Sequence, residues 1–113
     1  MTPEAFRKLA LAIPGAVEGG HMGHPDFRRD GKIFATLGSP TEAHAMIKLP
    51  PEEQAVLVAA EPETFAPASG AWGRGGSTTI VLTKAKKASL EPALRLAWEA
   101  AVPRPRVRSK TKK

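Results

Sequence analysis

The sequence GHPDFRRDGKIFATLG, residues 23 to 38, contains the clearest structural signal in the chain. Two runs with strand character, 26–29 and 32–37, flank the dipeptide Asp30-Gly31. Asp and Gly both tolerate the left-handed backbone of a two-residue hairpin turn. The pattern therefore predicts a β-hairpin, and with it an antiparallel sheet.

Further elements are predicted on both sides of this hairpin. Thr2 and Pro3 are a favourable helix cap and first residue, and apolar residues then recur at helical spacing over about 3–13. Gly19 and Gly20 indicate a connector between this helix and the hairpin. After the hairpin, residues 43–49 alternate between apolar and polar side chains, which predicts a third strand.

The second half of the chain adds two helices and a strand. Two prolines followed by two acids open a helix that ends near residue 60, and 61–77 is expected to be irregular because it is rich in Pro and Gly. β-Branched residues over 78–83 predict a strand, and a one-sided apolar stripe predicts a helix from about Ser89. The expected fold class is α+β, in two layers, with an antiparallel sheet and three helices on one side.

Length and composition favour one globular domain. The chain has 113 residues, of which 42% are hydrophobic and 25% charged, so a single core is expected. The absence of cysteine excludes disulfides and thiolate chemistry and favours a reducing compartment. No apolar run approaches the length of a membrane span or a signal peptide. A soluble, cytoplasmic protein without membrane contact is expected.

The net charge of +6 is concentrated at one end of the chain. Residues 1–102 hold 11 Lys and Arg against 11 Asp and Glu, which is a formal charge of zero. The remaining segment has no acid and six cations, namely Arg104, Arg106, Arg108, Lys110, Lys112 and Lys113. We therefore expect a domain over 1–102 and a basic, disordered C-terminal tail over 103–113, which reaches the phosphates of nucleic acid.

The glycine cluster SGAWGRGGS, residues 69–77, is the first candidate for a binding site. Its spacing is similar to a phosphate-binding P-loop, but Gly76 stands where that motif needs Lys, and a strand is predicted where it needs a helix. Trp72 and Arg74 are candidates for stacking on nucleic-acid bases. We expect, however, that Trp72 fills the end of the core, as a lone Trp commonly does, so Trp72→Ala should lose stability.

Metal and catalytic chemistry find little support. His21, His24 and Asp26 are close in sequence, with His44 on another strand, but glycine and proline make their segment a loop, so we expect polar loop residues rather than a metal site. No nucleophile with a base and no paired-carboxylate motif occurs. The chain is expected to need no metal or cofactor and not to be an enzyme.

One face of the predicted sheet is the second candidate, because three helices do not readily cover both faces. If Ile33, Ile47 and Ile80 face the helices, the other face carries a mixed apolar and polar set, namely Phe34, Met46, Val81, Thr36, His44 and Lys48. An apolar patch of this kind marks a protein partner or a homodimer surface. The alternative is that the segment 61–77 folds over it.

Three segments resemble the MmcQ/YjbR family of small bacterial proteins. They are residues 23–38, the sequence MIKLPPEEQ at 46–54 and the sequence SGAWGRGGSTTIVL at 69–82, and the helix end LAIPG at 11–15 agrees with them. The resemblance, from about Ala5 to Trp98, implies a compact domain similar to the secretion-chaperone-like and double-wing DNA-binding folds. Members are labelled DNA-binding, largely by likeness of fold. The resemblance implies no catalytic residues.

Two functional hypotheses follow. The first is a protein that binds nucleic acid, DNA by the family label, in a largely electrostatic and sequence-tolerant way. The second is a protein-interaction module that uses the open sheet face or the glycine-rich segment 69–77.

Overall fold

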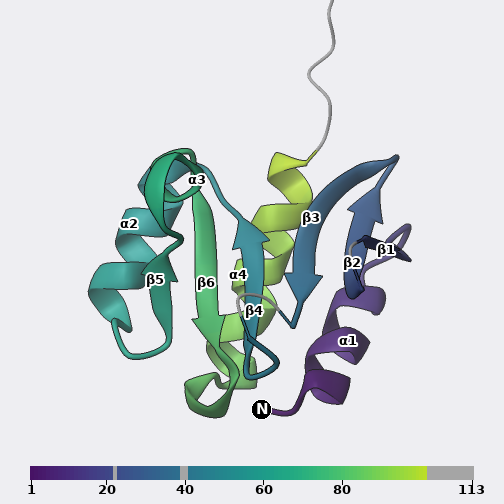
Figure 1. Cartoon of the computed structure of the whole chain (residues 1–113), viewed down its shortest axis with the longest axis horizontal. Coiled ribbons are helices and arrows are strands. Elements are labelled where there is room, and N and C mark those ends of the chain that lie inside the picture. Colours follow the sequence, from purple (N-terminus) through teal and green to yellow (C-terminus); the bar gives the residue numbers. More distant parts are fainter. Residues whose placement is uncertain (22, 39–40, 102–113) are drawn as a thin grey trace, which may run out of the picture.

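The computed structural model describes residues 1–21, 23–38 and 41–101, apart from the side chain of His21. Six antiparallel strands form one sheet in the order β1-β2-β3-β4-β6-β5 (Figure 1). The strands are β1 Val17–His21, β2 His24–Arg29, β3 Lys32–Leu37, β4 His44–Lys48, β5 Phe65–Pro67 and β6 Ser77–Val81. The helices are α1 Pro3–Leu11, α2 Pro51–Ala60, α3 Gly70–Arg74 and α4 Lys87–Ala100, with a short 3-10 turn, η1, over Leu82–Lys84.

The β2–β3 hairpin turns at Asp30 and Gly31 as predicted. Their φ angles are 49° and 84°, the left-handed region that this turn requires. The predicted connector at Gly19 and Gly20 is wrong, because both glycines lie in β1, where they pair with Asp26 and Pro25 of β2. Glycine has a low strand propensity, so this strand depends on its neighbour rather than on its own side chains.

A bulge in β3 corrects the predicted assignment of faces. The register shifts after Phe27, which pairs with Ala35, while Arg28 pairs with Ile33 and leaves Phe34 as the additional residue. Phe34 is fully buried and its ring meets Trp98 of α4 edge-on, at 5.6 Å between ring centroids. Phe34 therefore faces the helices, and Ile33 takes the place on the open face that had been expected for Phe34.

Helices α1, α2 and α4 pack on one face of the sheet, as predicted. Phe6 of α1 meets Phe27 of β2 at 6.0 Å between ring centroids, and Trp98 joins α4 to β3. Gln54 of α2 bonds to the hydroxyl of Thr78 in β6. The largest fully buried apolar side chains belong to one core, and they are Phe6, Phe27, Phe34, Phe65, Ile47, Ile80, Leu82, Leu90 and Leu94. The α+β class with three helices on one side is confirmed.

The segment 61–77 is more regular than predicted. It contains strand β5, which pairs with β6 at the sheet edge, and the five-residue helix α3. Phe65 of β5 is fully buried opposite Ile80. A three-residue strand and a helix with two glycines leave almost no periodicity in the sequence, and tertiary pairing forms them.

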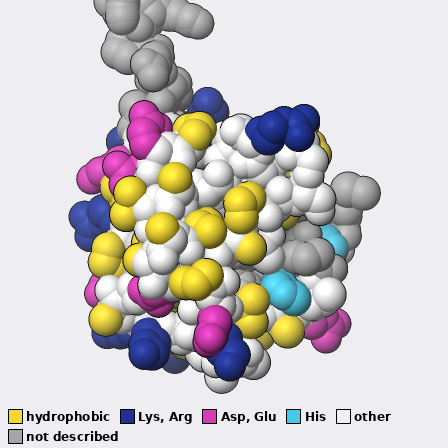
Figure 2. Space-filling view, turned by 90° about the vertical axis from the view of Figure 1, so that its left-hand side faces the viewer, with side chains coloured by type: hydrophobic (Ala, Val, Ile, Leu, Met, Phe, Trp, Pro, Cys, Tyr) yellow, Lys and Arg dark blue, Asp and Glu magenta, His cyan; other side chains and the backbone are white. Residues whose placement is uncertain are grey.

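Charges of both signs are mixed on the surface around α2. Figure 2 shows acidic and basic side chains dispersed among apolar ones on this side of the molecule. The formal balance of 11 cations and 11 anions over residues 1–102 agrees with this distribution. Within the ranges that the structure describes, no helix is long and apolar enough to cross a membrane. Val102 and the predicted tail, 103–113, lie outside the described residues.

Candidate functional site

The face of the sheet opposite α1, α2 and α4 carries a continuous row of side chains. Register places Thr36 of β3, Met46 of β4 and Thr79 of β6 side by side across three neighbouring strands. The next position along the same face pairs Lys48 with Ser77. The prediction that Thr36, Met46 and Lys48 share the open face is therefore confirmed.

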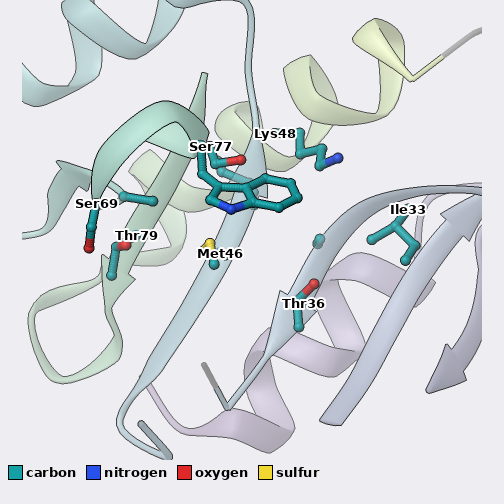
Figure 3. Close-up of a pocket in the computed structure, with 11 residues that line it drawn as sticks. Ile33, Thr36, Met46, Lys48, Ser69, Ser77 and Thr79 are labelled. Carbon is teal, nitrogen blue, oxygen red and sulfur yellow. The ribbon is translucent and has the colours of Figure 1, made fainter. Parts of the chain in front are cut away.

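A hollow of about 490 Å³ lies on this face and is bounded by Trp72 of α3 (Figure 3). Met46, Thr36 and Ile33 contribute to it from β3 and β4. Ser69, Ser77 and Thr79 contribute hydroxyl groups from the β6 side, and Lys48 stands at the end near the indole. The hollow thus combines an apolar floor with hydroxyls, one aromatic ring and one ammonium group.

Trp72 does not fill the core. Its surface is 70% exposed, and the Nζ atom of Lys48 lies over its ring, 5.8 Å from the centroid. The prediction that Trp72 plugs the end of the core is wrong. The neighbouring Gly73 is the buried residue of α3, and this packing turns Trp72 outward over the open face. Arg74, at the end of the same helix, is also exposed.

Close backbone packing holds α3 in this position. A Cβ atom on Gly73 would lie 1.8 Å from the carbonyl oxygen of Ala68, and one on Gly76 would lie 1.8 Å from that of Leu49. The Leu49 amide also donates to the Gly76 carbonyl at 3.0 Å. Gly73 and Gly76 therefore serve close packing, and strand β6 follows the cluster where a P-loop would have a helix.

Ser77 is a buried residue whose hydroxyl has no partner in the part of the chain that the structure describes. Ser77 is only 7% exposed, and its Oγ atom makes no hydrogen bond to any residue that the structure describes. Ser77 and Trp72 both line the hollow. The adjacent Thr78 points to the opposite face, where its hydroxyl donates to the Gly76 carbonyl at 2.9 Å. Buried polar groups are normally paired, so Ser77 offers a hydrogen-bonding group to whatever occupies the hollow.

A partly buried ion pair lies on β2, the strand next to β3. Arg28 donates from Nε and Nη2 to the two carboxylate oxygens of Asp26, at 2.7 and 3.0 Å, and Asp26 is fully buried. The hydrogen bond to Asp26, followed by its charge, raises the pKa of Arg28 above its already high ordinary value. The guanidinium therefore stays charged at every pH near neutrality, and its contribution to stability is constant there.

The sequence of the domain and its fold agree with one family. The YjbR family model matches residues 11–100. The chain belongs to the YjbR family. Its structure is similar to the crystal structure of Deinococcus radiodurans protein DR2400, described as having a DUF419 domain, with a TM-score of 0.71 and 18% sequence identity. The similarity covers 86% of this chain and 75% of the other. The sequence matches no curated protein.

The structure of this YjbR protein describes two of the predicted site residues and leaves the other six outside its described ranges. Trp72 and Arg74 lie together on α3, but the six cations from Arg104 to Lys113 lie outside the described residues. Helix α4 ends at the same end of the sheet as α3 (Figure 1). Sequence reasoning did not connect Lys48 and Ser77 with Trp72, because only strand pairing brings them together.

Two of the candidate metal ligands, Asp26 and His44, have other partners. Asp26 is paired with Arg28, and the Nδ1 atom of His44 lies 2.7 Å from the hydroxyl of Thr41. Among the residues placed by the structure, no group of three His, Cys, Asp or Glu side chains is arranged to hold a metal ion.

Proposed function

We propose that this YjbR-family protein binds nucleic acid in a largely electrostatic, sequence-tolerant way. One observation carries the proposal, namely the exposed indole of Trp72 with the ammonium of Lys48 5.8 Å from its ring. An exposed aromatic ring offers a base a stacking surface, and a cation beside it neutralises phosphate. Arg74 adds a second exposed cation, on the same helix as Trp72.

The basic segment supplies most of the affinity in this proposal. Residues 1–102 are formally neutral, and the six cations between Arg104 and Lys113 hold all of the excess charge. Six neutralised phosphates correspond to a slope of log K against log salt no steeper than about −5, from roughly −0.9 per phosphate on duplex DNA.

Titration of one DNA duplex and one single strand tests the role of this segment. The full chain is compared with a chain ending at Val102, whose fold is checked by circular dichroism, between about 50 and 200 mM salt. We expect truncation to weaken binding and to flatten the salt slope. Equal affinities and slopes for the two chains would refute the role of the basic segment.

Trp72→Ala in the full chain tests the stacking surface. We expect weaker binding to the single strand, because stacking contributes about 1 to 3 kcal/mol per base. Val56 is a matched control, since it is 62% exposed on α2, and Val56→Ala should leave binding unchanged. Equal binding by the two variants would remove Trp72 from the proposed interface.

A second candidate function is a protein-interaction module. The apolar floor of the hollow at Met46 and Ile33, beside Trp72, also fits an apolar side chain of a partner or of a second copy. Light scattering of the full chain over a range of concentrations tests the homodimer. A dimer that Trp72→Ala dissociates would favour this function over nucleic-acid binding.

The proposal contains no catalytic step. The residues around the hollow provide hydroxyls and one ammonium group but no base paired with a nucleophile.

A further inference from the structure

We infer that the hollow under Trp72 is a site for one unpaired nucleotide, with the base on the indole, the phosphate at Lys48 and a polar edge at Ser77. This inference rests on the proposed nucleic-acid binding and specifies which form of nucleic acid the domain itself recognises. It concerns the folded domain, not the basic segment.

The size and shape of the hollow fit one nucleotide. Its volume of about 490 Å³ lies within the range of roughly 300 to 1,000 Å³ that is typical of small-ligand sites. The Trp72 ring stands at its margin with most of its surface free, and Met46 lies on the floor below (Figure 3). A flat ring entering here contacts the indole and an apolar floor, which is the environment that a base prefers.

The charge of the hollow selects an anion. Lys48 is the cation among the lining residues that the structure describes, and none of these lining residues carries a carboxylate. Its ammonium has no ion pair within the described part of the chain and lies over the indole ring. When a base stacks on Trp72, the phosphate joined to it through the sugar therefore comes close to the Lys48 ammonium, the cation of the hollow.

The Ser77 hydroxyl supplies an independent argument. Ser77 is more than nine-tenths buried and lines the hollow together with Trp72, and its hydroxyl has no partner among the described residues. A purely apolar occupant would leave this hydroxyl unpaired, which costs free energy. A nucleotide offers donors and acceptors along its base edge and on its phosphate, so it satisfies Ser77 where an apolar side chain does not.

Only an unpaired base can occupy this site. A base inside a duplex has both faces stacked on its neighbours, so its ring is not available to Trp72. Two sources remain, a free mononucleotide and a base exposed in a single strand. Both present the same ring and phosphate, and the experiment separates them.

Adenosine 5′-monophosphate is the probe, and the full chain with Trp98→Phe makes Trp72 the single fluorophore. We expect the nucleotide to quench Trp72 saturably, and ribose 5-phosphate, which lacks the base, to bind at least about fivefold more weakly. Calorimetry on the unsubstituted chain gives the same comparison if Trp98→Phe folds poorly. Equal binding of the two compounds, or no binding of either, would overturn the inference.

Two variants test the polar contacts. Lys48→Met and Ser77→Ala should each weaken nucleotide binding by about threefold to tenfold, the effect of one lost hydrogen bond or charge contact. Lys86→Met, at an exposed lysine before α4, is the matched control and should bind normally. Ser77→Ala should keep the melting temperature, whereas Thr78→Ala should lower it, because of the two hydroxyls only that of Thr78 has partners among the described residues. Normal nucleotide binding by both Lys48→Met and Ser77→Ala would refute the site.

Competition identifies the source of the nucleotide. An oligo-dA single strand should displace the mononucleotide more effectively per base than a duplex of the same length, which favours the single strand as the ligand. Displacement by the mononucleotide only, with no advantage for the single strand, would assign the hollow to a free nucleotide. Equal displacement by the duplex would overturn the requirement for an unpaired base.

The failure of this inference and the failure of the proposed function are distinguishable. If truncation at Val102 left the salt slope unchanged, the proposed role of the basic segment would be refuted, while quenching of Trp72 by the nucleotide would still be observed.

Discussion

The side-chain amide of Gln54 in α2 donates to the carbonyl oxygen of Gly73 in α3 at 3.0 Å. The same nitrogen lies 3.0 Å from the Ser77 carbonyl oxygen and 3.2 Å from the Thr78 hydroxyl, so α2, α3 and β6 meet at one buried amide. Through this contact a helix on the packed face of the sheet fixes the short helix that places Trp72 over the open face.

Loss of this amide should weaken the whole domain. We expect Gln54→Met to lower the free energy of unfolding by about 1 to 3 kcal/mol, because buried acceptors lose their donor. Urea denaturation measures the change. Glu52→Met, at an exposed position two residues earlier on α2, is the control and should change stability little. Equal stabilities of the two variants would show that Gln54 does not organise this junction.

The two tryptophans should respond in opposite ways to truncation. Trp72→Ala should leave stability nearly unchanged, because the side chain is 70% exposed. Trp98→Ala should cost about 3 kcal/mol, because its ring packs on Phe34 and lies 4.3 Å under the guanidinium of Arg29. Chemical denaturation of the two variants checks the contrast. A large loss of stability in Trp72→Ala would contradict its exposed position and indicate that the side chain packs in the core.

Glycine at position 73 should be irreplaceable, unlike glycine at position 75. An alanine Cβ at Gly73 would lie 1.8 Å from the Ala68 carbonyl oxygen. This oxygen belongs to the backbone, which cannot move far enough to relieve the clash. At Gly75 the nearest atom is 3.5 Å away and φ is −84°, so Gly75→Ala should be tolerated. Thermal unfolding and Trp72 fluorescence of both variants test this. Similar melting temperatures would contradict the packing described for α3.

The ion pair on β2 should depend on the absence of a side chain at Gly19. A Cβ atom there would lie 3.0 Å from both Nε of Arg28 and Oδ1 of Asp26, so Gly19→Ala should displace the pair and lower the melting temperature. Gly20→Ala is the matched control in the same strand, because a Cβ atom there would lie 3.4 Å from its nearest neighbour, the carbonyl oxygen of His24. We expect the control to be clearly more stable than Gly19→Ala. If Gly20→Ala were the less stable variant, strand propensity rather than the ion pair would explain the effect of these substitutions.

Elements with strong local signals were predictable. The turn at Asp30-Gly31, the alternation in β4 and the apolar stripe of α4 each depend on residues near one another in the chain. Predictions failed where a distant partner decides the structure. Gly19 and Gly20 became strand residues through pairing with β2, and Phe34 moved to the packed face through a bulge whose register is set by the same strand.

The candidate site was predictable only in part. Trp72 and Arg74 stood out because an aromatic ring and a guanidinium are rare in a glycine-rich segment, but the sequence could not tell whether the ring was buried. Ser77 had no signal of its own, since a serine at the start of a strand is unremarkable until its hydroxyl is found buried beside Trp72.

By itself, the sequence determined the α+β class, the neutral balance over residues 1–102 and the concentration of positive charge after Val102. These properties follow from local periodicity and from counting charges, and neither needs a contact between distant residues. Only the tertiary structure decided that Trp72 points outward and that Lys48 and Ser77 lie beside it. The reason is that the close approach of Gly73 to Ala68 orients α3, and the pairing of β4 with β6 then places the lysine and the serine beneath the indole.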